Sequence, residues 1–295
     1  MVTPSPQSTL FAPIAKLRLL LASIRFEHSV FALPFAYLGM ALAAGGVPSW
    51  PKLAWITVAM VAARTLAMSA NRLIDLPQDA LNPRTRGRAL VTGALKKRDM
   101  LALSLVSLAA FFLAAAMLNT LALALAPAAA VAVVAYSYVK RFTWATHFAL
   151  GAADAIAPAG GWIAVSGTLP WQGVLLAFAV ATWIGGFDIF YACQDVEFDR
   201  AHGVHSIPQR FGIQAAFWAV RAMHLATSLA LLALGLWMGL AWPYYVGWAL
   251  ASALLVYEHR IISPRDLSRL NVAFFNVNGY IAVIVFIFAL AALYV

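Results

Sequence analysis

Long apolar runs are the feature that most constrains this chain. About nine of them follow one another, each close to the 20 residues that a helix needs to cross the hydrocarbon of a bilayer. The runs are continuously apolar and do not alternate, so they indicate helices and not the strands of a barrel. The sequence therefore predicts an all-α, polytopic membrane protein with about nine transmembrane helices, at residues 27–46, 53–71, 99–118, 121–138, 147–166, 172–192, 214–235, 236–257 and 272–294.

The composition agrees with a chain whose solvent is lipid. Hydrophobic residues make up 63% of the 295 residues and charged residues only 11%, which excludes a soluble globular domain. The single cysteine, Cys193, excludes an intrachain disulfide, and the net charge of +9 indicates membrane topology and not affinity for nucleic acid. We expect one domain over residues 1–295, with a loose tail at 1–13, two four-helix halves at about 27–138 and 147–257, and an added helix at about 272–294.

The positive charges fall almost entirely on one side of the predicted spans. All Lys and Arg residues except Lys52 and Arg64 lie in the N-terminal segment, in alternate loops or at the span ends beside them. Short cytoplasmic loops are enriched in Lys and Arg. The sequence therefore predicts a protein of the inner (cytoplasmic) membrane, with its N-terminus in the cytoplasm and its C-terminus outside.

Two acidic motifs end the second and the sixth predicted spans. Because these spans hold matching positions in the two halves, we expect both motifs at the same membrane depth, facing one cavity. Pro77 disfavours helix at Leu76, so the second span is predicted to break there and Asp79 to approach from a loop. The motif residues are Asn71, Asp75 and Asp79 in the first motif and Asp188, Asp195 and Asp199 in the second.

The spacing of the second motif indicates metal chemistry. Asp195 and Asp199 stand four residues apart, on one face of a helix. Carboxylates so close repel each other unless a cation lies between them, and Mg²⁺ uses such carboxylates together with substrate phosphates. A solvated helix end with scattered charges is the alternative, which two motifs at one depth disfavour. The motifs therefore predict a magnesium-bound diphosphate.

Cationic residues near the motifs are candidate diphosphate ligands. Arg88, Lys140 and Arg141 could hold phosphate oxygens and stabilise the charge of a leaving group, while an anchor at the membrane surface is the alternative for the last two. Arg64 lies inside the second span, where an arginine needs an anion. That anion is either Asp154 or a carboxylate of the substrate.

Aromatic residues surround the same region. The π faces of Tyr136 and Tyr191 could stabilise a developing carbocation, although most aromatic side chains in such a chain belong to the core or to the interfacial belt.

At these residues the chain resembles the UbiA superfamily of intramembrane aromatic prenyltransferases. It looks closest to the 4-hydroxybenzoate polyprenyltransferase group, which includes relatives that prenylate a naphthoate for menaquinone. The family signature is Asn-x-x-x-Asp-x-x-x-Asp on the second helix and Asp-x-x-x-Asp on the sixth. This chain departs from it at Arg72, where many members have Asp, and at Pro77. The resemblance covers nearly the whole chain and includes Arg64, Asn82-Pro83-Arg84-Thr85, Tyr138-Val139-Lys140-Arg141 and His205-Ser206-Ile207-Pro208.

The resemblance implies a Mg²⁺-dependent transferase that joins a polyprenyl diphosphate to an aromatic acid for ubiquinone or menaquinone biosynthesis. Its central cavity is expected to open near the cytoplasmic face, among lipid. Asn71, Asp75, Asp79, Asp195 and Asp199 are the implied metal ligands. The implied substrate-binding residues are Arg64, Arg88, Lys140, Arg141, Tyr136 and Tyr191, and the catalytic residues are Asp75, Asp195, Asp188 and Lys140. Either Asp188 or Asp195 would take the ring proton or hold the phenol.

Two other functions fit the same residues. The fold could serve another acceptor, such as haem or a sugar phosphate, through a different pocket. A secondary transporter could use the intramembrane carboxylates and the arginine as an ion path. A transporter, however, places ionisable residues near the bilayer midplane, whereas here they collect at the cytoplasmic ends.

Overall fold

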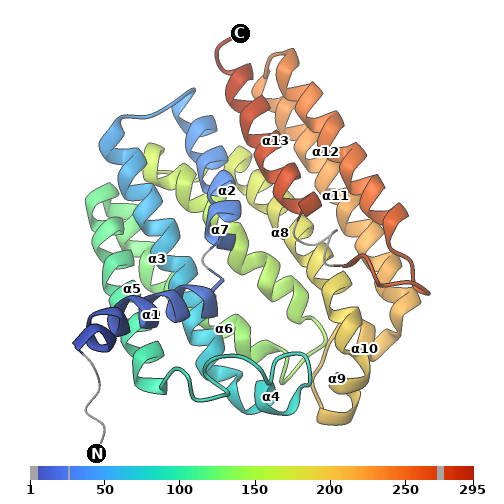
Figure 1. Ribbon diagram of the computed structural model, residues 1–295. Coiled ribbons are helices and arrows are strands. Elements are labelled where there is room, and N and C mark those ends of the chain that lie inside the picture. The colour runs from blue at the N-terminus through green and yellow to red at the C-terminus, as the bar shows by residue number, and fades with distance from the viewer. Residues whose placement is uncertain (1–5, 26, 271–275) are drawn as a thin grey trace, which may run out of the picture.

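The computed structural model describes residues 6–25, 27–270 and 276–295, and these residues fold into helices joined by turns (Figure 1). In chain order the helices are α1 (Pro6–Ser23), α2 (Glu27–Ala44), α3 (Trp50–Ile74), α4 (Leu76–Leu81), α5 (Lys97–Leu118), α6 (Thr120–Val139), α7 (Thr146–Ser166), α8 (Trp171–Ala192), α9 (Val196–His202), α10 (Ile207–Phe211), α11 (Ile213–Met238), α12 (Trp242–Ile261) and α13 (Asn278–Ala292), with a 3₁₀ turn, η1 (Cys193–Asp195), between α8 and α9.

Every predicted span falls on a helix, so the all-α fold is confirmed. Among the described residues, six helices are long and apolar enough to cross a membrane: α3, α5, α6, α7, α8 with its continuation to His202, and α11. Shorter apolar helices occupy residues 33–44 and α13. Residues 272–275 of the last predicted span lie outside the described residues.

One predicted boundary is corrected. The turn after the seventh span was expected between Gly235 and Leu236, but α11 continues to Met238 and the chain turns at Gly239, whose φ is 62°. This left-handed conformation favours glycine at the end of a helix. The N–H of Leu240 donates back to the Gly235 carbonyl oxygen and closes the helix end.

The predicted loose tail also differs. Residues 6–13 are helical, because α1 begins at Pro6, and residues 1–5 lie outside the described part of the chain. Proline suits the first turn of a helix, where its missing N–H would have no partner. The far end of α1 contacts α3, since Arg72 Nε donates to the Ser23 carbonyl oxygen at 2.9 Å.

Glycine allows the central helices to approach closely. Helix α7 packs against both α2 and α8. A Cβ on Gly161 of α7 would lie 2.1 Å from the Ala36 carbonyl oxygen of α2, and a Cβ on Gly39 of α2 would lie 2.0 Å from the Pro158 carbonyl oxygen of α7. Small residues permit such contacts between membrane helices. The two glycines therefore set the distance between α2 and α7.

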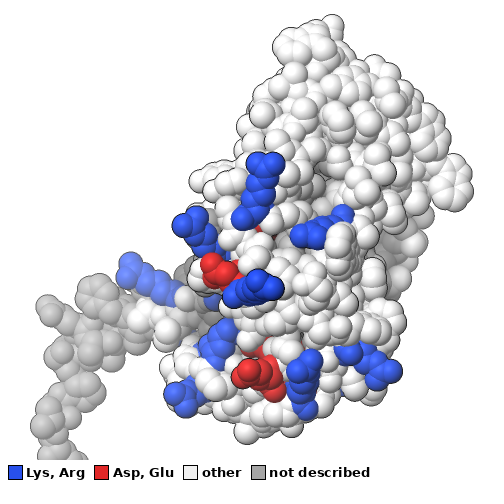
Figure 2. All heavy atoms as spheres, turned by 90° about the vertical axis from the view of Figure 1, so that its right-hand side faces the viewer, with Lys and Arg blue, Asp and Glu red and all other residues white. Residues whose placement is uncertain are grey.

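Charged residues gather at one end of the helices, and three tryptophans begin helices at the other. In Figure 2 the upper part of the visible face shows no Lys, Arg, Asp or Glu, whereas these residues gather below it. Trp50, Trp171 and Trp242 begin α3, α8 and α12 and are 80%, 73% and 67% exposed. Tryptophan is enriched at membrane interfaces. Helices α3 and α8 run from the tryptophan end to the charged end, which brings both acidic motifs to the same end of the molecule (Figure 1).

Candidate active site

A cavity of about 850 Å³ lies among α2, α3, α5, α6, α7 and α8. Apolar residues such as Ile56, Phe111 and Leu125 line part of it, and both acidic motifs line its charged end. The predicted site residues that line this cavity are Arg64, Asn71, Asp75, Asp79, Arg88, Tyr136, Lys140, Asp188, Tyr191, Asp195 and Asp199. The fold thus brings nearly all of the predicted residues together.

The first motif lies at a break between two helices. Helix α3 ends at Ile74, Asp75 joins it to α4, and Pro77 lies in the first turn of α4. The predicted break is therefore present, but Asp79 belongs to the short helix α4 and not to a loop. Proline at the start of a helix sacrifices no hydrogen bond, which explains why a new helix follows the break directly.

Asp75 is buried beneath two polar partners. Its Oδ2 accepts from Asn71 Nδ2 at 2.8 Å and from Lys140 Nζ at 2.5 Å. Its Oδ1 is buried and has no hydrogen-bond partner among the described residues. A buried carboxylate is tolerated only when it is paired, so Lys140 neutralises Asp75.

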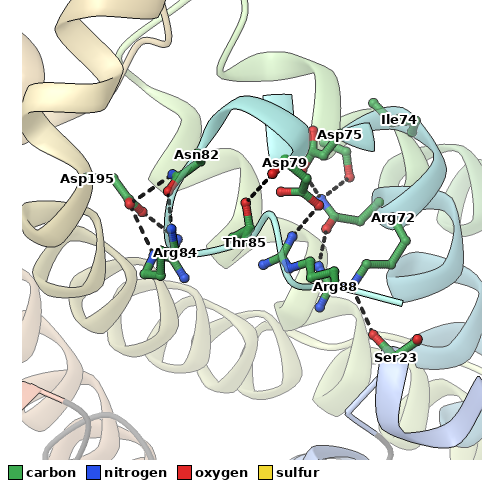
Figure 3. Close-up of polar contacts among 12 residues, drawn as sticks. Ser23, Arg72, Ile74, Asp75, Asp79, Asn82, Arg84, Thr85, Arg88 and Asp195 are labelled. Atoms are coloured by element: carbon green, nitrogen blue, oxygen red, sulfur yellow. Dashed lines mark hydrogen bonds and ion pairs between the residues drawn. The ribbon is translucent and has the colours of Figure 1, made fainter. Parts of the chain in front are cut away.

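The chain after α4 folds back over the first motif. Arg88 pairs with Asp79, and Thr85 Oγ1 donates to the Asp79 carbonyl oxygen at 3.0 Å. Figure 3 shows Arg88 and Thr85 approaching Asp79, while Arg72 extends away toward Ser23. Arg72 therefore contacts the end of α1, and it also lines the cavity.

The second motif was predicted to lie on one regular helix, but the structure differs. Helix α8 ends at Ala192, the 3₁₀ turn follows, and Asp195 precedes α9. Arg84 donates to Asp195 through two bonds, from Nη2 at 2.5 Å and from Nε at 3.1 Å, and Asn82 Nδ2 donates to the same carboxylate at 3.2 Å (Figure 3). The loop after the first motif thus binds the second motif directly.

Arg84 keeps its positive charge in this position. Burial alone would lower the pKa of its guanidinium, but the hydrogen bonds and the charge of Asp195 outweigh burial and raise that pKa. The same guanidinium donates from Nη1 to the Tyr191 hydroxyl at 3.1 Å and lies 5.1 Å from the centre of the Tyr191 ring. The sequence analysis assigned no role to Arg84, although the stretch Asn82-Pro83-Arg84-Thr85 that contains it is part of the resemblance.

The other carboxylates of the second half have polar partners of their own. Ser206 Oγ donates to Asp199 Oδ2 at 3.1 Å. Asp188 Oδ2 lies 2.6 Å from His147 Nδ1, and both residues line the cavity. Sequence reasoning missed His147, whose signal is a histidine near the start of an otherwise apolar run.

Two predicted cations have different surroundings. Arg64 lines the cavity and its Nε is buried without a hydrogen bond; it forms no direct ion pair among the described residues, but Asp154, which also lines the cavity, attracts it electrostatically. Arg141 does not line the cavity. Arg141 Nη2 donates to the Ile74 carbonyl oxygen at 2.6 Å, and the guanidinium lies over the Tyr138 ring. Arg141 therefore stabilises the end of α3.

The donor set fits a divalent cation that shares its ligands with a diphosphate. Carboxylates of both motifs line one cavity, and a buried oxygen of Asp75 has no partner in the described chain. Oxygen ligands of this kind are those that Mg²⁺ prefers. Across residues 6–25, 27–270 and 276–295, no three His, Cys, Asp or Glu side chains are grouped as metal ligands, and the chain's own cations pair with Asp75, Asp79 and Asp195 individually.

Comparison with known proteins identifies similar chains. The model of the UbiA prenyltransferase family matches residues 32–293. A 4-hydroxybenzoate octaprenyltransferase from Aeromonas salmonicida is 34% identical over 83% of this chain and 84% of the relative. A 4-hydroxybenzoate octaprenyltransferase from Citrobacter koseri is 32% identical over 81% of this chain and 83% of the relative.

Solved structures share the fold. A UbiA homologue from Aeropyrum pernix K1, in its apo form, has a TM-score of 0.83 and 33% identity over 90% of this chain and 98% of its own. A UbiA homologue from Archaeoglobus fulgidus bound to DMAPP and Mg²⁺ has a TM-score of 0.72 and 20% identity over 94% of this chain and 99% of its own. The second likeness concerns the fold alone.

Proposed function

The chain belongs to the UbiA prenyltransferase family and is an integral membrane transferase, and on this premise we propose that it transfers a polyprenyl group from a prenyl diphosphate to an aromatic acid in quinone biosynthesis. The acceptor is 4-hydroxybenzoate or a hydroxynaphthoate. The observation that carries the proposal is one cavity with carboxylates and cations at its charged end and apolar walls elsewhere. This division matches a substrate with a diphosphate head and a hydrocarbon tail.

The charged end is the proposed diphosphate site. Mg²⁺ bound there would stabilise the negative charge of the leaving diphosphate as a Lewis acid. The residues that would hold it are Asn71, Asp75, Asp79, Asp195 and Asp199, and all of them line the cavity.

Lys140, Arg88 and Arg84 act on the diphosphate in the proposed reaction. Each of them pairs with a motif carboxylate in the described structure. When the diphosphate enters, these cations turn to its oxygens. The allylic C–O bond then breaks, its electron pair leaves with the diphosphate, and the three cations stabilise the charge that develops.

Arg64 is the proposed ligand of the acceptor's carboxylate. Its guanidinium lines the cavity, its Nε is buried without a hydrogen bond, and it forms no direct ion pair within the described residues. An arginine inside a membrane protein needs an anion, and an aromatic acid supplies one. The bound ring carbon beside the hydroxyl attacks the allylic cation and forms the new C–C bond.

Asp188 is the proposed acceptor of the ring proton. Asp195 belongs to the residues that would hold Mg²⁺, whereas Asp188 is the motif carboxylate outside that set and lies beside His147. Asp188 lines the cavity, and 27% of its side chain is exposed. Loss of the ring proton to Asp188 restores aromaticity, while the apolar walls exclude the water that would quench the cation.

A product assay tests the proposed function. The purified protein is incubated with Mg²⁺, a polyprenyl diphosphate and either 4-hydroxybenzoate or a dihydroxynaphthoate, and the product is identified by mass spectrometry. We expect a prenylated aromatic acid, which EDTA abolishes and added Mg²⁺ restores. Prenylation of haem or of a sugar phosphate instead, with both aromatic acids untouched, would contradict the proposed acceptor.

A further inference from the structure

His147 connects Asp188 to the segment that follows the second acidic motif. The ring of His147 lies on α7, with its side chain only 3% exposed. On one side, Nδ1 lies 2.6 Å from Asp188 Oδ2. On the other side, the backbone N–H of Ile207 donates to Nε2 at 3.3 Å.

The second contact fixes the tautomer of the imidazole. A backbone N–H can only donate, so Nε2 must be the unprotonated nitrogen of the ring. Nδ1 then carries the hydrogen of the neutral ring and donates a hydrogen bond to Asp188.

The segment 205–207 also forms hydrogen bonds with two further site residues. The His205 N–H donates to the Lys140 carbonyl oxygen at 2.7 Å, and Ser206 Oγ donates to Asp199 Oδ2. Three consecutive residues therefore each contact a different part of the site. His205 contacts the backbone of Lys140, Ser206 contacts the second acidic motif, and Ile207 contacts His147. The position of His147 is thus tied to the region that binds the diphosphate.

We propose that His147 is a positioning residue, which aims the carboxylate of Asp188 at the aromatic acceptor and restrains it by the Nδ1–H bond. This inference rests on the proposed function, because it assigns His147 to the step in which the ring proton leaves. One oxygen of Asp188 is occupied by His147, and the other is left to take the proton. A neutral histidine suits this role, since it donates to the carboxylate without competing for the proton.

Steady-state kinetics on the purified full-length protein test the proposal. His147→Phe retains the approximate size of the ring and removes both hydrogen bonds. His147→Asn retains an N–H donor at the position of Nδ1 and removes the acceptor for Ile207. Asp188→Asn and the double variant His147→Phe/Asp188→Asn complete a double-mutant cycle.

We expect His147→Phe to lower kcat about tenfold or more, as for a lost hydrogen bond to a charged group, with the KM for the prenyl diphosphate within about twofold of wild type. His147→Asn should recover most of that kcat. In the Asp188→Asn background, His147→Phe should have no further effect on kcat.

Three results would overturn the inference alone. The first is that the wild type is active and His147→Phe has the same kcat. The second is that His147→Phe lowers kcat as much in the Asp188→Asn background as in the wild type. The third is that His147→Asn loses as much kcat as His147→Phe. If His147→Phe does not fold, kcat of His147→Asn is compared with that of wild type. A loss of about tenfold or more in His147→Asn would then overturn the inference. Absence of any prenylated product from the wild type would instead overturn the proposed function, and the inference with it.

Discussion

At the scale of single residues, the cations of this chain neutralise its own acidic motifs. Lys140 pairs with Asp75, Arg88 with Asp79, and Arg84 with Asp195. Buried carboxylates without partners would cost several kcal/mol each. The proposed reaction exchanges these ion pairs for contacts with the diphosphate and its metal. The affinity of the diphosphate therefore depends on residues that already occupy the site.

Arg84 and Arg86 provide a matched test of this exchange. Arg84→Ala should weaken prenyl diphosphate binding about tenfold or more, because a charge-assisted bond to the phosphate oxygens is lost. Arg86→Ala, in the same loop but outside the cavity lining, should leave that affinity unchanged. Titration calorimetry with a non-reacting diphosphate analogue measures both. Equal affinities in the two variants would show that Arg84 serves only to pair with Asp195.

Arg64 is expected to select the acceptor's carboxylate. Arg64→Ala should raise the KM for the aromatic acid about thirtyfold or more, the equivalent of losing about 2 kcal/mol from a buried charge pair. The KM for the prenyl diphosphate should not change. The methyl ester of the same acid is the control substrate, because it lacks the charge and should respond little to the variant. A loss of diphosphate affinity alone would show that the assignment of Arg64 is wrong.

The sequence predicted which residues meet but not how each is paired. The acidic motifs, Arg64 and Lys140 stand out because charges near lipid are costly. The bond between Arg84 and Asp195 joins positions 111 residues apart, and no local pattern reports it. Arg141 looked equivalent to Lys140 in sequence, but the turn after α6 directs it to the end of α3.

At the scale of elements, both acidic motifs lie at irregularities of their helices. Pro77 makes the first break readable from the sequence, since proline disfavours helix in the residue before it. The 3₁₀ turn at Cys193–Asp195 contains neither proline nor glycine, so the sequence predicted a continuous helix there. Tertiary contacts of Asp195 with Arg84 and Asn82 accompany this turn. The irregularities direct carboxylates from different elements into one cavity.

Gly160 and Gly161 test the packing of α2 against α7. Gly161→Ala should lower the thermal stability of the purified protein, because its Cβ would lie 2.1 Å from the Ala36 carbonyl oxygen and force the helices apart. Gly160→Ala should keep or raise the melting temperature, since nothing lies within 4 Å of its Cβ and alanine favours helix. Thermal unfolding in detergent measures both. A Gly161→Ala protein as stable as Gly160→Ala would contradict the close contact.

At the scale of the whole molecule, the charged residues gather at one end of the bundle. The alternation of Lys and Arg along the chain predicts this distribution, and the structure places the acidic motifs at the charged end. Family membership confirms the resemblance drawn from those motifs. The shape of the cavity depends on how the helices around it pack together, and apolar runs carry no information about that packing.

We propose that the charged end faces the cytoplasm, with the N-terminus on the same side and the C-terminus outside. In a Cys193→Ala background, single cysteines are introduced at Val47 or at Arg86, which are both exposed. Val47 lies just before α3, and Arg86 lies in the loop that follows α4, at the other end of the molecule. A membrane-impermeant maleimide should label position 47 in intact cells and position 86 only after permeabilisation. The reverse pattern would show the opposite orientation.

The central claim is that the two acidic motifs form one magnesium-dependent diphosphate site. Titration calorimetry with a non-reacting prenyl diphosphate analogue tests it most directly, on wild type, Asp75→Asn, Asp195→Asn and the exposed neighbour Glu197→Gln. We predict one analogue bound per chain, only with Mg²⁺, with affinity reduced about tenfold or more by either aspartate variant and unchanged by Glu197→Gln. Wild-type affinity in Asp75→Asn or in Asp195→Asn, or binding that does not need Mg²⁺, would contradict a single shared site.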